Sequence, residues 1–316
     1  MLPNTIDYEF DVTCVDTEQQ RRGMACCYLL RSGDAYAFVE CGTSLSVPGL
    51  LAVLDARGIA REQVAYVMPT HVHLDHAGGV GKLLGELPAA KLVVHPRGAR
   101  HMIDPSKLIE GATAVYGAER MAAMYGEILP VAESRVILAT DNLRLDFSGR
   151  ELLFIDAPGH AKHHYAIWDA RSRGWFTGDV FGLSYREFDG PQGPFLFPTT
   201  TPVQFDPEAW TQTLERLLAP KPDWIYLTHY GRLGNVEVLA ATLRRGLGEY
   251  QNIALALAQA PTRHAALQQA LTELSLSEVA ELQAPITPAY ARELLALDMN
   301  LNAQGLEVWL DRDSSS

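Results

Sequence analysis

Residues 68–79 read MPTHVHLDHAGG and place three of the chain's ten histidines within six residues, with an aspartate between them. His71 and His73 are two residues apart, so on an extended segment both imidazoles project from the same face. Asp75 and His76 follow in a predicted loop that leads into the next helix. Because imidazole nitrogen and carboxylate oxygen both bind divalent zinc, the stretch predicts a metal site. The alternative is a polar loop that happens to be rich in histidine.

Three further polar residues each follow an apolar, strand-like segment elsewhere in the chain: His160, Asp179 and His229. In layered α/β proteins, sites are built at the carboxyl ends of strands. Two metals about 3.5–4 Å apart need more ligands than one short loop supplies. The four segments together offer five histidines and two aspartates. Each of the three would be explained more simply as a structural residue if it stood alone, but their shared position favours a two-metal centre.

The other histidines have weaker signals. His164 is interpreted as a residue that supports a ligand or begins a strand, and His163 is expected to face solvent or the rim of a pocket. His95 and His264 lack partners in the sequence and are interpreted as structural. A position of His101 facing the pocket is a minor alternative.

The apolar pattern around the quoted stretch alternates between strands and helices, which is typical of layered α/β proteins. Residues 25–41 read as two strands joined around a Ser-Gly-Asp turn. Further strands are predicted at 64–68, 91–95, 135–139, 142–147, 151–157, 165–169, 174–178 and 224–227. Helices are predicted at 48–57, 80–87, 207–218 and, with breaks at 260–262 and 284–287, from 235 to about 310. Residues 100–133 mix helix and loop, and 186–204 form a long loop.

Composition limits the class of partner. The chain has 316 residues, 47% of them hydrophobic, and a net charge of −12. That charge argues against nucleic acid or an anionic membrane as the main partner. No run approaches the roughly 20 apolar residues of a membrane span, and the N-terminal residues do not resemble a signal peptide. A cytoplasmic protein is therefore expected, with reduced core thiols at Cys14, Cys26, Cys27 and Cys41.

HVHLDH at 71–76, APGHAKHH with His160, FTGDVFG with Asp179 and LTHYG with His229 together resemble the metallo-β-lactamase superfamily over about residues 25–232. The resemblance implies an α/β fold, a four-layer αββα sandwich with the metals at one edge of the sheets. It implies a catalytic domain at 1–233. Residues 234–316 would be a helical C-terminal extension packed on the same domain, similar to that of the quorum-sensing thioesterase-like branch.

The resemblance also implies a role for each of the seven donors. The first metal would be held by His71, His73 and His160. The second would be held by Asp75, His76 and His229. Asp179 would bridge the two metals. Two divalent ions are expected, with zinc favoured by the ligand set and iron or manganese left open.

Two metals that share a water lower its pKa, so the expected reaction is attack of a bridging hydroxide on an ester, thioester or lactone carbonyl of a small molecule. Asp75 is the predicted catalytic residue, since it can also orient the nucleophile and pass a proton. Attack by a hydroxide needs no serine or cysteine nucleophile. In agreement with this, the sequence contains no GxSxG motif.

Details of the motifs separate the branches of the superfamily. The presence of both His73 and His76 argues against the flavodiiron branch. Lactonase-like members often carry a tyrosine where this chain has Gly182, and Tyr185 lies three residues further on. No lysine follows Lys221, which disfavours a glutathione thioester. The alternatives are a mononuclear-iron, persulfide-dioxygenase-like oxidoreductase, or a regulatory or binding protein that retains the metals with little turnover.

Loops 100–133 and 186–204 are expected to cover the metals. Their apolar residues either line a substrate pocket or simply pack the loops: Tyr116, Met121, Met124, Tyr125, Phe188, Phe195 and Phe197. Contact of His164 or Tyr185 with substrate is left open. The helices after residue 234 are expected to form a pocket wall or the interface of a homodimer.

Overall fold

The computed structural model describes residues 2–200 and 203–313. The contacts of the chain divide it into two compact units that alternate along the sequence. Unit 1 consists of Met1–Asp156, His163–Gly178 and Asp223–Arg232, and unit 2 consists of Ala157–Lys162, Asp179–Pro222 and Leu233–Ser316. The predicted division into residues 1–233 and 234–316 stays a prediction.

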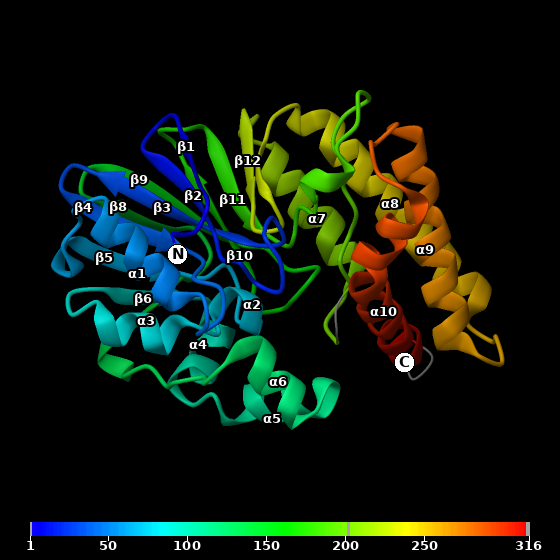
Figure 1. The fold of residues 1–316 in the computed structure, drawn as a ribbon, viewed down its shortest axis with the longest axis horizontal. Coiled ribbons are helices and arrows are strands. Elements are labelled where there is room, and N and C mark those ends of the chain that lie inside the picture. The colour runs from blue at the N-terminus through cyan, green and yellow to red at the C-terminus, as the bar shows by residue number, and fades with distance from the viewer. Residues whose placement is uncertain (1, 201–202, 314–316) are drawn as a thin grey trace. The chain divides into compact units, whose positions relative to one another are not determined.

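The first sheet of unit 1 follows the order of the sequence from strand to strand (Figure 1). Its strands are β1 (Thr5–Tyr8), β2 (Val12–Asp16), β3 (Cys26–Ser32), β4 (Ala35–Val39), β5 (Val64–Met68), β6 (Lys91–Val94) and β7 (Val136–Leu138). Strands β1 to β4 pair antiparallel, whereas β4 to β7 pair in parallel. Parallel neighbours need crossover connections, and these contain helices α1 (Val47–Ala56) and α3 (Val80–Glu86).

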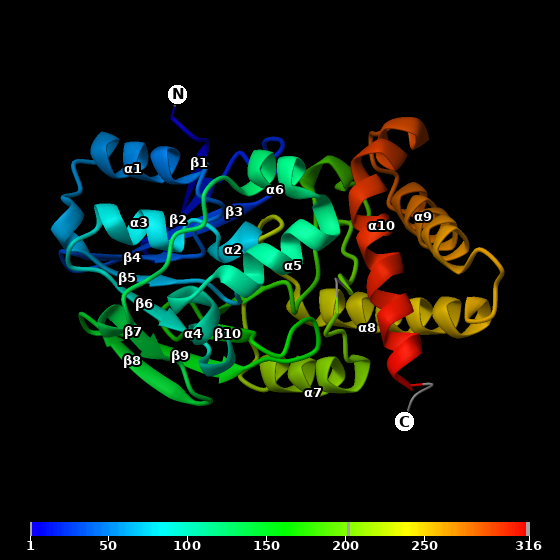
Figure 2. The same cartoon turned by 90° about the horizontal axis from the view of Figure 1, so that it is seen from below.

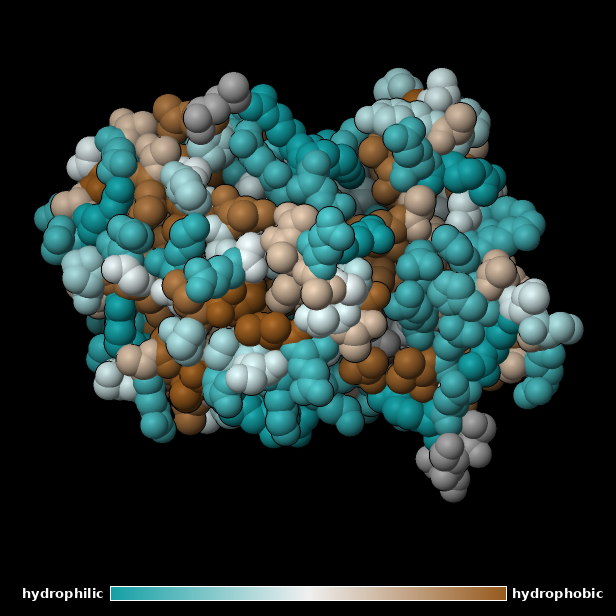
Figure 3. Space-filling model, turned by 60° about the horizontal axis from the view of Figure 1, so that its bottom comes forward, coloured by the Kyte–Doolittle hydropathy of each residue, from teal (hydrophilic) through white to brown (hydrophobic). Residues whose placement is uncertain are grey.

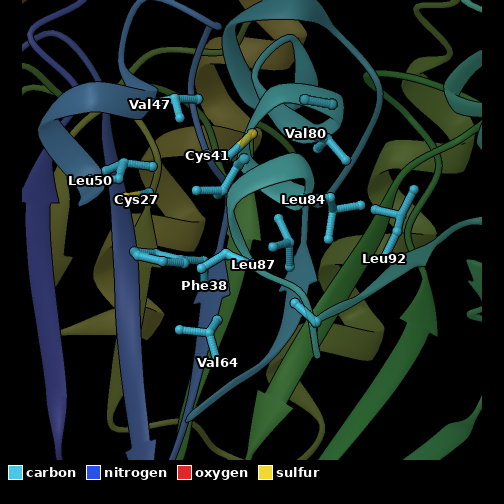
Figure 4. Close-up of a cluster of buried hydrophobic side chains, with 14 of the residues drawn as sticks. Cys27, Phe38, Cys41, Val47, Leu50, Val64, Val80, Leu84, Leu87 and Leu92 are labelled. Atoms are coloured by element: carbon cyan, nitrogen blue, oxygen red, sulfur yellow. The ribbon is translucent and has the colours of Figure 1, made fainter. Parts of the chain in front are cut away.

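Helices α1 and α3 cover one face of this sheet with apolar side chains. In Figure 4, Leu50 of α1 and Val80 and Leu84 of α3 belong to the same cluster as Phe38 and Val64 of the sheet. All five side chains are buried. Burial of such a side chain is worth about 1.5–3 kcal/mol relative to exposure, so this layer contributes strongly to the stability of unit 1.

The second sheet has the strand order β13-β12-β11-β10-β9-β8. Its strands are β8 (Leu143–Phe147), β9 (Arg150–Asp156), β10 (Tyr165–Asp169), β11 (Gly174–Gly178), β12 (Trp224–Leu227) and β13 (Gly231–Leu233). Strands β8 to β11 pair antiparallel, and β12 runs parallel to β11. The two sheets share an apolar core, in which the ring of Tyr28 from β3 lies 5.1 Å from that of Phe176 from β11.

The cysteines occupy two different cores. All four are free and buried, as predicted. Cys26 packs between the two sheets, whereas Cys27 packs in the cluster covered by helices α1 and α3. Successive residues of a strand face opposite sides, so the placement of this adjacent pair agrees with its position in β3.

Helices dominate unit 2. They are α7 (Pro207–Leu218), α8 (Val236–Leu257), α9 (Arg263–Glu281) and α10 (Pro288–Asp313). The Asp206 side chain caps α7 by accepting a hydrogen bond from the Ala209 N–H at 3.0 Å, and Pro207 begins the helix, as predicted. No helix within residues 2–200 and 203–313 is both long and apolar enough to cross a membrane.

The surface of the molecule mixes polar and apolar residues on the face that Figure 3 shows.

The predicted loop at 186–204 belongs to unit 2 and contains one 3₁₀ turn, η3 (Arg186–Phe188); residues 201 and 202 lie outside the described part of the chain. Phe188, Phe195 and Phe197 are buried. The ring of Phe195 lies 5.4 Å from that of Phe188 and 5.2 Å from that of Phe197. These contacts favour the interpretation that the phenylalanines pack the loop.

A helical segment lies between β6 and β7 of unit 1. It contains α4 (Pro96–Ile103), α5 (Ser106–Tyr116) and α6 (Ala118–Tyr125). Figures 1 and 2 show α5 and α6 close to the short helix α2 (Leu74–Ala77). Two 3₁₀ turns, η1 (Arg61–Gln63) and η2 (Glu133–Arg135), precede β5 and β7.

The predicted strands and helices are confirmed with small shifts at their ends. The predicted loop at Asp75 and His76 is wrong, because these residues lie in α2. The His73 carbonyl accepts hydrogen bonds from the His76 and Ala77 N–H groups at 3.0 and 2.9 Å, which closes a helical turn directly after the motif's second histidine. Strands β1, β2 and β13 were not predicted.

Candidate metal centre

His71 and His73 follow the end of β5 and their rings lie next to each other, which agrees with the prediction that both project from one face. Their ring centroids are 4.4 Å apart, and His71 Nε2 lies 2.9 Å from His73 Nδ1. The His71 side chain is fully buried, whereas His73 is partly exposed. Two imidazole nitrogens so close together are the arrangement expected when both bind one metal.

Asp75, His76 and His229 form a second group of donors in unit 1. One ligand atom from each lies within 4.8 Å of the others. Asp75 Oδ2 is 3.6 Å from His76 Nε2 and 3.4 Å from His229 Nε2. The histidine side chains are 0% and 3% exposed, but Asp75 is 26% exposed. The carboxylate is therefore the member of this group that solvent or a substrate can reach.

Each of these imidazoles is oriented through its other nitrogen. His76 Nδ1 donates to Glu40 Oε1 at 3.1 Å, and His229 Nδ1 donates to the Met24 carbonyl at 2.8 Å. His71 Nδ1 lies 3.1 Å from Thr70 Oγ1. Metal-binding histidines typically use one nitrogen in this way, which turns the second toward the metal. The donor set and its supporting hydrogen bonds therefore fit a divalent metal.

Glu40 connects three strand ends beneath these donors. Its carboxylate is 1% exposed and accepts hydrogen bonds from Thr70 N at 3.0 Å, Thr70 Oγ1 at 2.5 Å and Thr228 Oγ1 at 3.0 Å, besides that from His76. Glu40 follows β4, Thr70 follows β5 and Thr228 follows β12. Glu40 was not predicted as a site residue, although a polar residue directly after an apolar strand is the signal that identified the other candidates.

Gly79 allows the turn that carries Asp75 and His76 to pack against the loop after β4. A Cβ atom on Gly79 would lie 2.6 Å from the Thr43 carbonyl oxygen, which only glycine avoids. The Gly79 N–H donates to the Gly42 carbonyl at 2.9 Å, and the Cys41 N–H donates to the His76 carbonyl at 3.1 Å. The close approach at Gly79 and these two hydrogen bonds therefore help to fix where Asp75 and His76 lie.

His160 and Asp179 lie together in unit 2. His160 Nε2 is 3.5 Å from Asp179 Oδ2, and His160 Nδ1 donates to the Thr199 carbonyl at 3.0 Å. Gly159 precedes the histidine with φ +135°, and a Cβ atom there would lie 2.5 Å from Trp210 Cβ. The pattern seen in His76 and His229 recurs in His160. One ring nitrogen donates a hydrogen bond to a carbonyl oxygen, and the other faces the carboxylate of Asp179.

The family model described as the metallo-beta-lactamase superfamily matches residues 21–229. The chain belongs to the metallo-beta-lactamase superfamily. The match runs from the loop before β3 to His229 and therefore includes all seven predicted ligands. The predicted αββα fold with additional C-terminal helices is confirmed for this member.

Known members give the extent of the similarity. The metallo-beta-lactamase fold-containing protein ST1585 of Sulfurisphaera tokodaii is 29% identical over 209 residues, which cover 62% of this chain and 73% of that protein. The crystal structure of ST1585 has a TM-score of 0.64 at 23% identity and covers 90% of this chain and 93% of that one.

Two other solved structures share the fold. The family protein TTHA1429 of Thermus thermophilus has a TM-score of 0.61 at 18% identity and covers 99% of this chain and 93% of that one. The metal-soaked Flv1 flavodiiron core of Synechocystis sp. PCC6803 has a TM-score of 0.56 at 17% identity and covers 87% and 68%.

Two histidines of APGHAKHH that were not predicted as ligands pack against predicted ligands of this superfamily member. His164 is buried, and its ring stacks on that of His71 with centroids 4.7 Å apart. The ring of His163 lies 5.4 Å from that of His73, and His163 is 8% exposed. The interpretation of His164 as a supporting residue agrees with this contact. Of the two alternatives for His163, a solvent-facing side chain is wrong, and a place at the rim of a pocket stays a prediction.

The remaining candidates have structural partners. His95 Nε2 lies 2.9 Å from Asp156 Oδ1, and His264 bonds to Glu307 and Asn300, as expected for structural histidines. His101 is partly exposed at the end of α4, where burial and then the charge of Arg100 lower its pKa. The Tyr185 hydroxyl donates to Asp298 of α10 at 3.1 Å and so anchors its loop within unit 2.

Proposed function

We propose that this protein is a dinuclear metal-dependent hydrolase that cleaves an ester, thioester or lactone bond in a small molecule. The observation that carries the proposal is the group formed by Asp75, His76 and His229, in which both imidazoles are turned toward an accessible carboxylate. Such preorganisation is what a catalytic metal site requires.

The proposed ligand assignment follows the sequence prediction. In this assignment His71, His73 and His160 would hold one metal, Asp75, His76 and His229 would hold the other, and Asp179 would be shared between them. The positions of Asp179 and His160 directly next to strands of the second sheet support this proposal. Asp179 is bonded to Gly178, the last residue of β11, and His160 lies in the short connection from β9 to β10.

Two bound divalent metals would acidify a water near neutral pH and polarise a carbonyl group. The protein's own residues would position the groups that take part in these steps. Asp75 is the exposed carboxylate of its group and can accept a proton from water and return it to the leaving group. Glu40 and the Met24 carbonyl hold the rings of His76 and His229, so neither ring must reorganise during the reaction.

Zinc is the proposed metal because imidazole and carboxylate donors suit it, although they also suit iron and manganese. The likeness to the flavodiiron core makes iron the alternative to test. A cytoplasmic location and a homodimer stay predictions.

Metal analysis and substrate screening of Asp179→Ala test the proposal. The wild-type protein is expected to bind two zinc ions and to hydrolyse some of a panel of p-nitrophenyl esters, acyl thioesters and lactones. Asp179→Ala is expected to lose bound metal and to lose more activity than the roughly 10–100-fold that removal of a supporting hydrogen-bond partner costs. Asp223→Ala is the matched control, because Asp223 is an exposed partner of Arg173.

Unchanged metal content and rate in Asp179→Ala would contradict the assignment. One bound iron with oxygen consumption on a persulfide would instead identify an oxidoreductase. If the wild-type protein and His73→Ala were equally inactive on the whole panel, a binding role would replace the catalytic one.

A further inference from the structure

Thr70 determines which nitrogen of His71 carries the proton. The Thr70 hydroxyl donates its only proton to Glu40 Oε1 at 2.5 Å. The same oxygen lies 3.1 Å from His71 Nδ1 and therefore accepts the proton of that nitrogen. The other nitrogen, His71 Nε2, then carries a lone pair and lies 2.9 Å from His73 Nδ1. His71 is thus held in the tautomer that can bind a metal through Nε2.

His164 covers the face of the same ring. The ring centroids of His164 and His71 are 4.7 Å apart and the ring planes are inclined by 22°, which is an offset stack. Both side chains are fully buried. Tyr165 directly follows His164, and its N–H donates to the Thr70 carbonyl at 2.9 Å. The backbone beside one ring is therefore bonded to the backbone beside the other, which keeps the two rings in register.

The end of β11 leaves room for both supporting side chains. Gly178 is the last residue of this strand and has φ +49°. A Cβ atom on Gly178 would overlap Thr70 Oγ1 and lie 2.7 Å from His164 Nε2. The polar atoms of both residues therefore meet at the same point of the backbone, which only glycine allows. Thr70 and His164 thus form one packed support around His71.

We infer that His164 is a positioning residue for the first metal group. Its ring holds the face of His71, while Thr70 holds the nitrogen that does not bind the metal, so that Nε2 points toward the ion shared with His73. The inference rests on the proposed function, because it takes these two histidines as metal ligands. A ligand ring that cannot rotate loses little conformational freedom on binding, so the support raises the affinity of the group for metal.

Three substitutions of His164 separate the contribution of its ring from that of its nitrogens. His164→Phe keeps an aromatic face, His164→Gln keeps hydrogen-bonding groups without a ring, and His164→Ala has neither. Affinity for cobalt(II) is measured by competition with a chelator. It is expected to fall roughly 10–100-fold in the glutamine and alanine variants, as on loss of other supporting contacts, and the phenylalanine variant is expected to recover most of that loss.

His95 provides the matched control. It is also a buried histidine of unit 1, and it is held by Asp156 Oδ1 and by the Arg97 N–H, to which its Nδ1 accepts a hydrogen bond. His95→Phe and His95→Ala measure the general cost of replacing a buried imidazole. Both are expected to lower the thermal stability of the metal-free protein without changing its affinity for cobalt(II).

The visible absorption of bound cobalt(II) reports the geometry of its ligands and does not depend on stability. At saturating cobalt(II), the bands of His164→Gln and His164→Ala are expected to shift, because His71 can then turn about its Thr70 hydrogen bond. The bands of His164→Phe should lie close to those of the wild type. Thr70→Val, which removes the acceptor of His71 Nδ1, should also shift them, and Thr70→Ser should restore them.

Hydrolysis of p-nitrophenyl acetate at saturating metal links the support to turnover. His164→Ala is expected to lower kcat roughly 10–100-fold. KM should stay nearly unchanged, since the substitution moves a metal ligand and no group that binds the substrate. His164→Phe should recover most of the lost kcat.

The outcomes separate the two proposals. Equal cobalt(II) affinities and spectra in all three His164 variants would overturn the positioning role. A loss in His164→Phe as large as that in His164→Ala would overturn it too, as would an equal loss of affinity in His95→Ala. If the wild type binds metal but hydrolyses no ester, and the affinities and spectra behave as expected, the hydrolase proposal fails while the positioning role of His164 stands.

Discussion

Two buried carboxylates of unit 1 occupy opposite ends of its strands and have different partners. Asp169 ends β10 and accepts hydrogen bonds from Arg150 Nε at 3.0 Å and Nη2 at 2.6 Å. Glu40 follows β4 and accepts hydrogen bonds from hydroxyl groups, a backbone N–H and His76. Both side chains are at most 1% exposed.

The difference shows what each end of the strands does. Arg150 neutralises the charge of Asp169 and also donates to the Arg31 carbonyl of β3 at 3.0 Å. This ion pair therefore joins the two sheets. Glu40 directs its charge at an imidazole that faces Asp75. One end of unit 1 therefore uses buried charge for stability, and the other uses it to orient a proposed metal ligand.

Arg150→Met removes the buried ion pair with Asp169 and has the largest expected effect on the free energy of unfolding. Removal of one partner of a buried ion pair costs about 3–5 kcal/mol, because the other charge stays buried. Urea denaturation should show this loss, whereas metal content per folded molecule should not change. Arg144→Met is the control: its ion pair with Glu151 is exposed and should contribute about 0–1 kcal/mol. Equal losses in both variants would remove the distinction between the two ends.

Glu40→Gln breaks the other end. The amide keeps the volume of the side chain but removes its charge, and its NH₂ group cannot accept a hydrogen bond. We expect metal affinity, measured by competition with a chelator, to fall roughly 10–100-fold. The free energy of unfolding should fall by about 1–3 kcal/mol. Glu151→Gln on the exposed surface should change neither quantity, and a Glu40→Gln protein with wild-type metal affinity would argue against a positioning role.

Thr228→Val sharpens the comparison with a smaller change. It removes one hydrogen bond to Glu40 and leaves the other three donors in place. The expected cost is about 0.5–1.5 kcal/mol of unfolding free energy, with a smaller loss of metal affinity than in Glu40→Gln. If Thr228→Val lowered metal affinity as much as Glu40→Gln, the charge of Glu40 would not be what orients His76.

Glu278 in α9 is a third carboxylate, for which a small effect of opposite sign is expected. Burial raises its pKa, and Arg245 at 3.7 Å lowers it only in part. A carboxyl group with a raised folded-state pKa destabilises the fold above that pKa, and the penalty disappears below the unfolded-state pKa. Glu278→Gln should therefore stabilise the protein at pH 7 and lose this advantage as the pH falls below 4.5. Thermal unfolding across this range would show it, and a constant difference would contradict it.

The sequence predicted most of the elements because their apolar patterns are strong and local. Strand β5 was predicted at its observed bounds, and the Asp206-Pro207 start of α7 is confirmed. Strands β1 and β2 were missed, because the pairing of β1 with β2 and of β2 with β3, rather than a local turn signal, defines them. Helix α2 was missed since a single turn, closed by the His73 carbonyl, has no periodicity to detect.

The same limit applies to the candidate site. The sequence by itself determined the family and the αββα fold class and predicted seven metal ligands, because residue types and their places after strands can be read along the chain. Only the tertiary structure showed that Glu40 holds His76 and that His163 is buried beside His73. These relations join residues 36 and 90 positions apart, and no local pattern encodes a contact that depends on how distant segments pack.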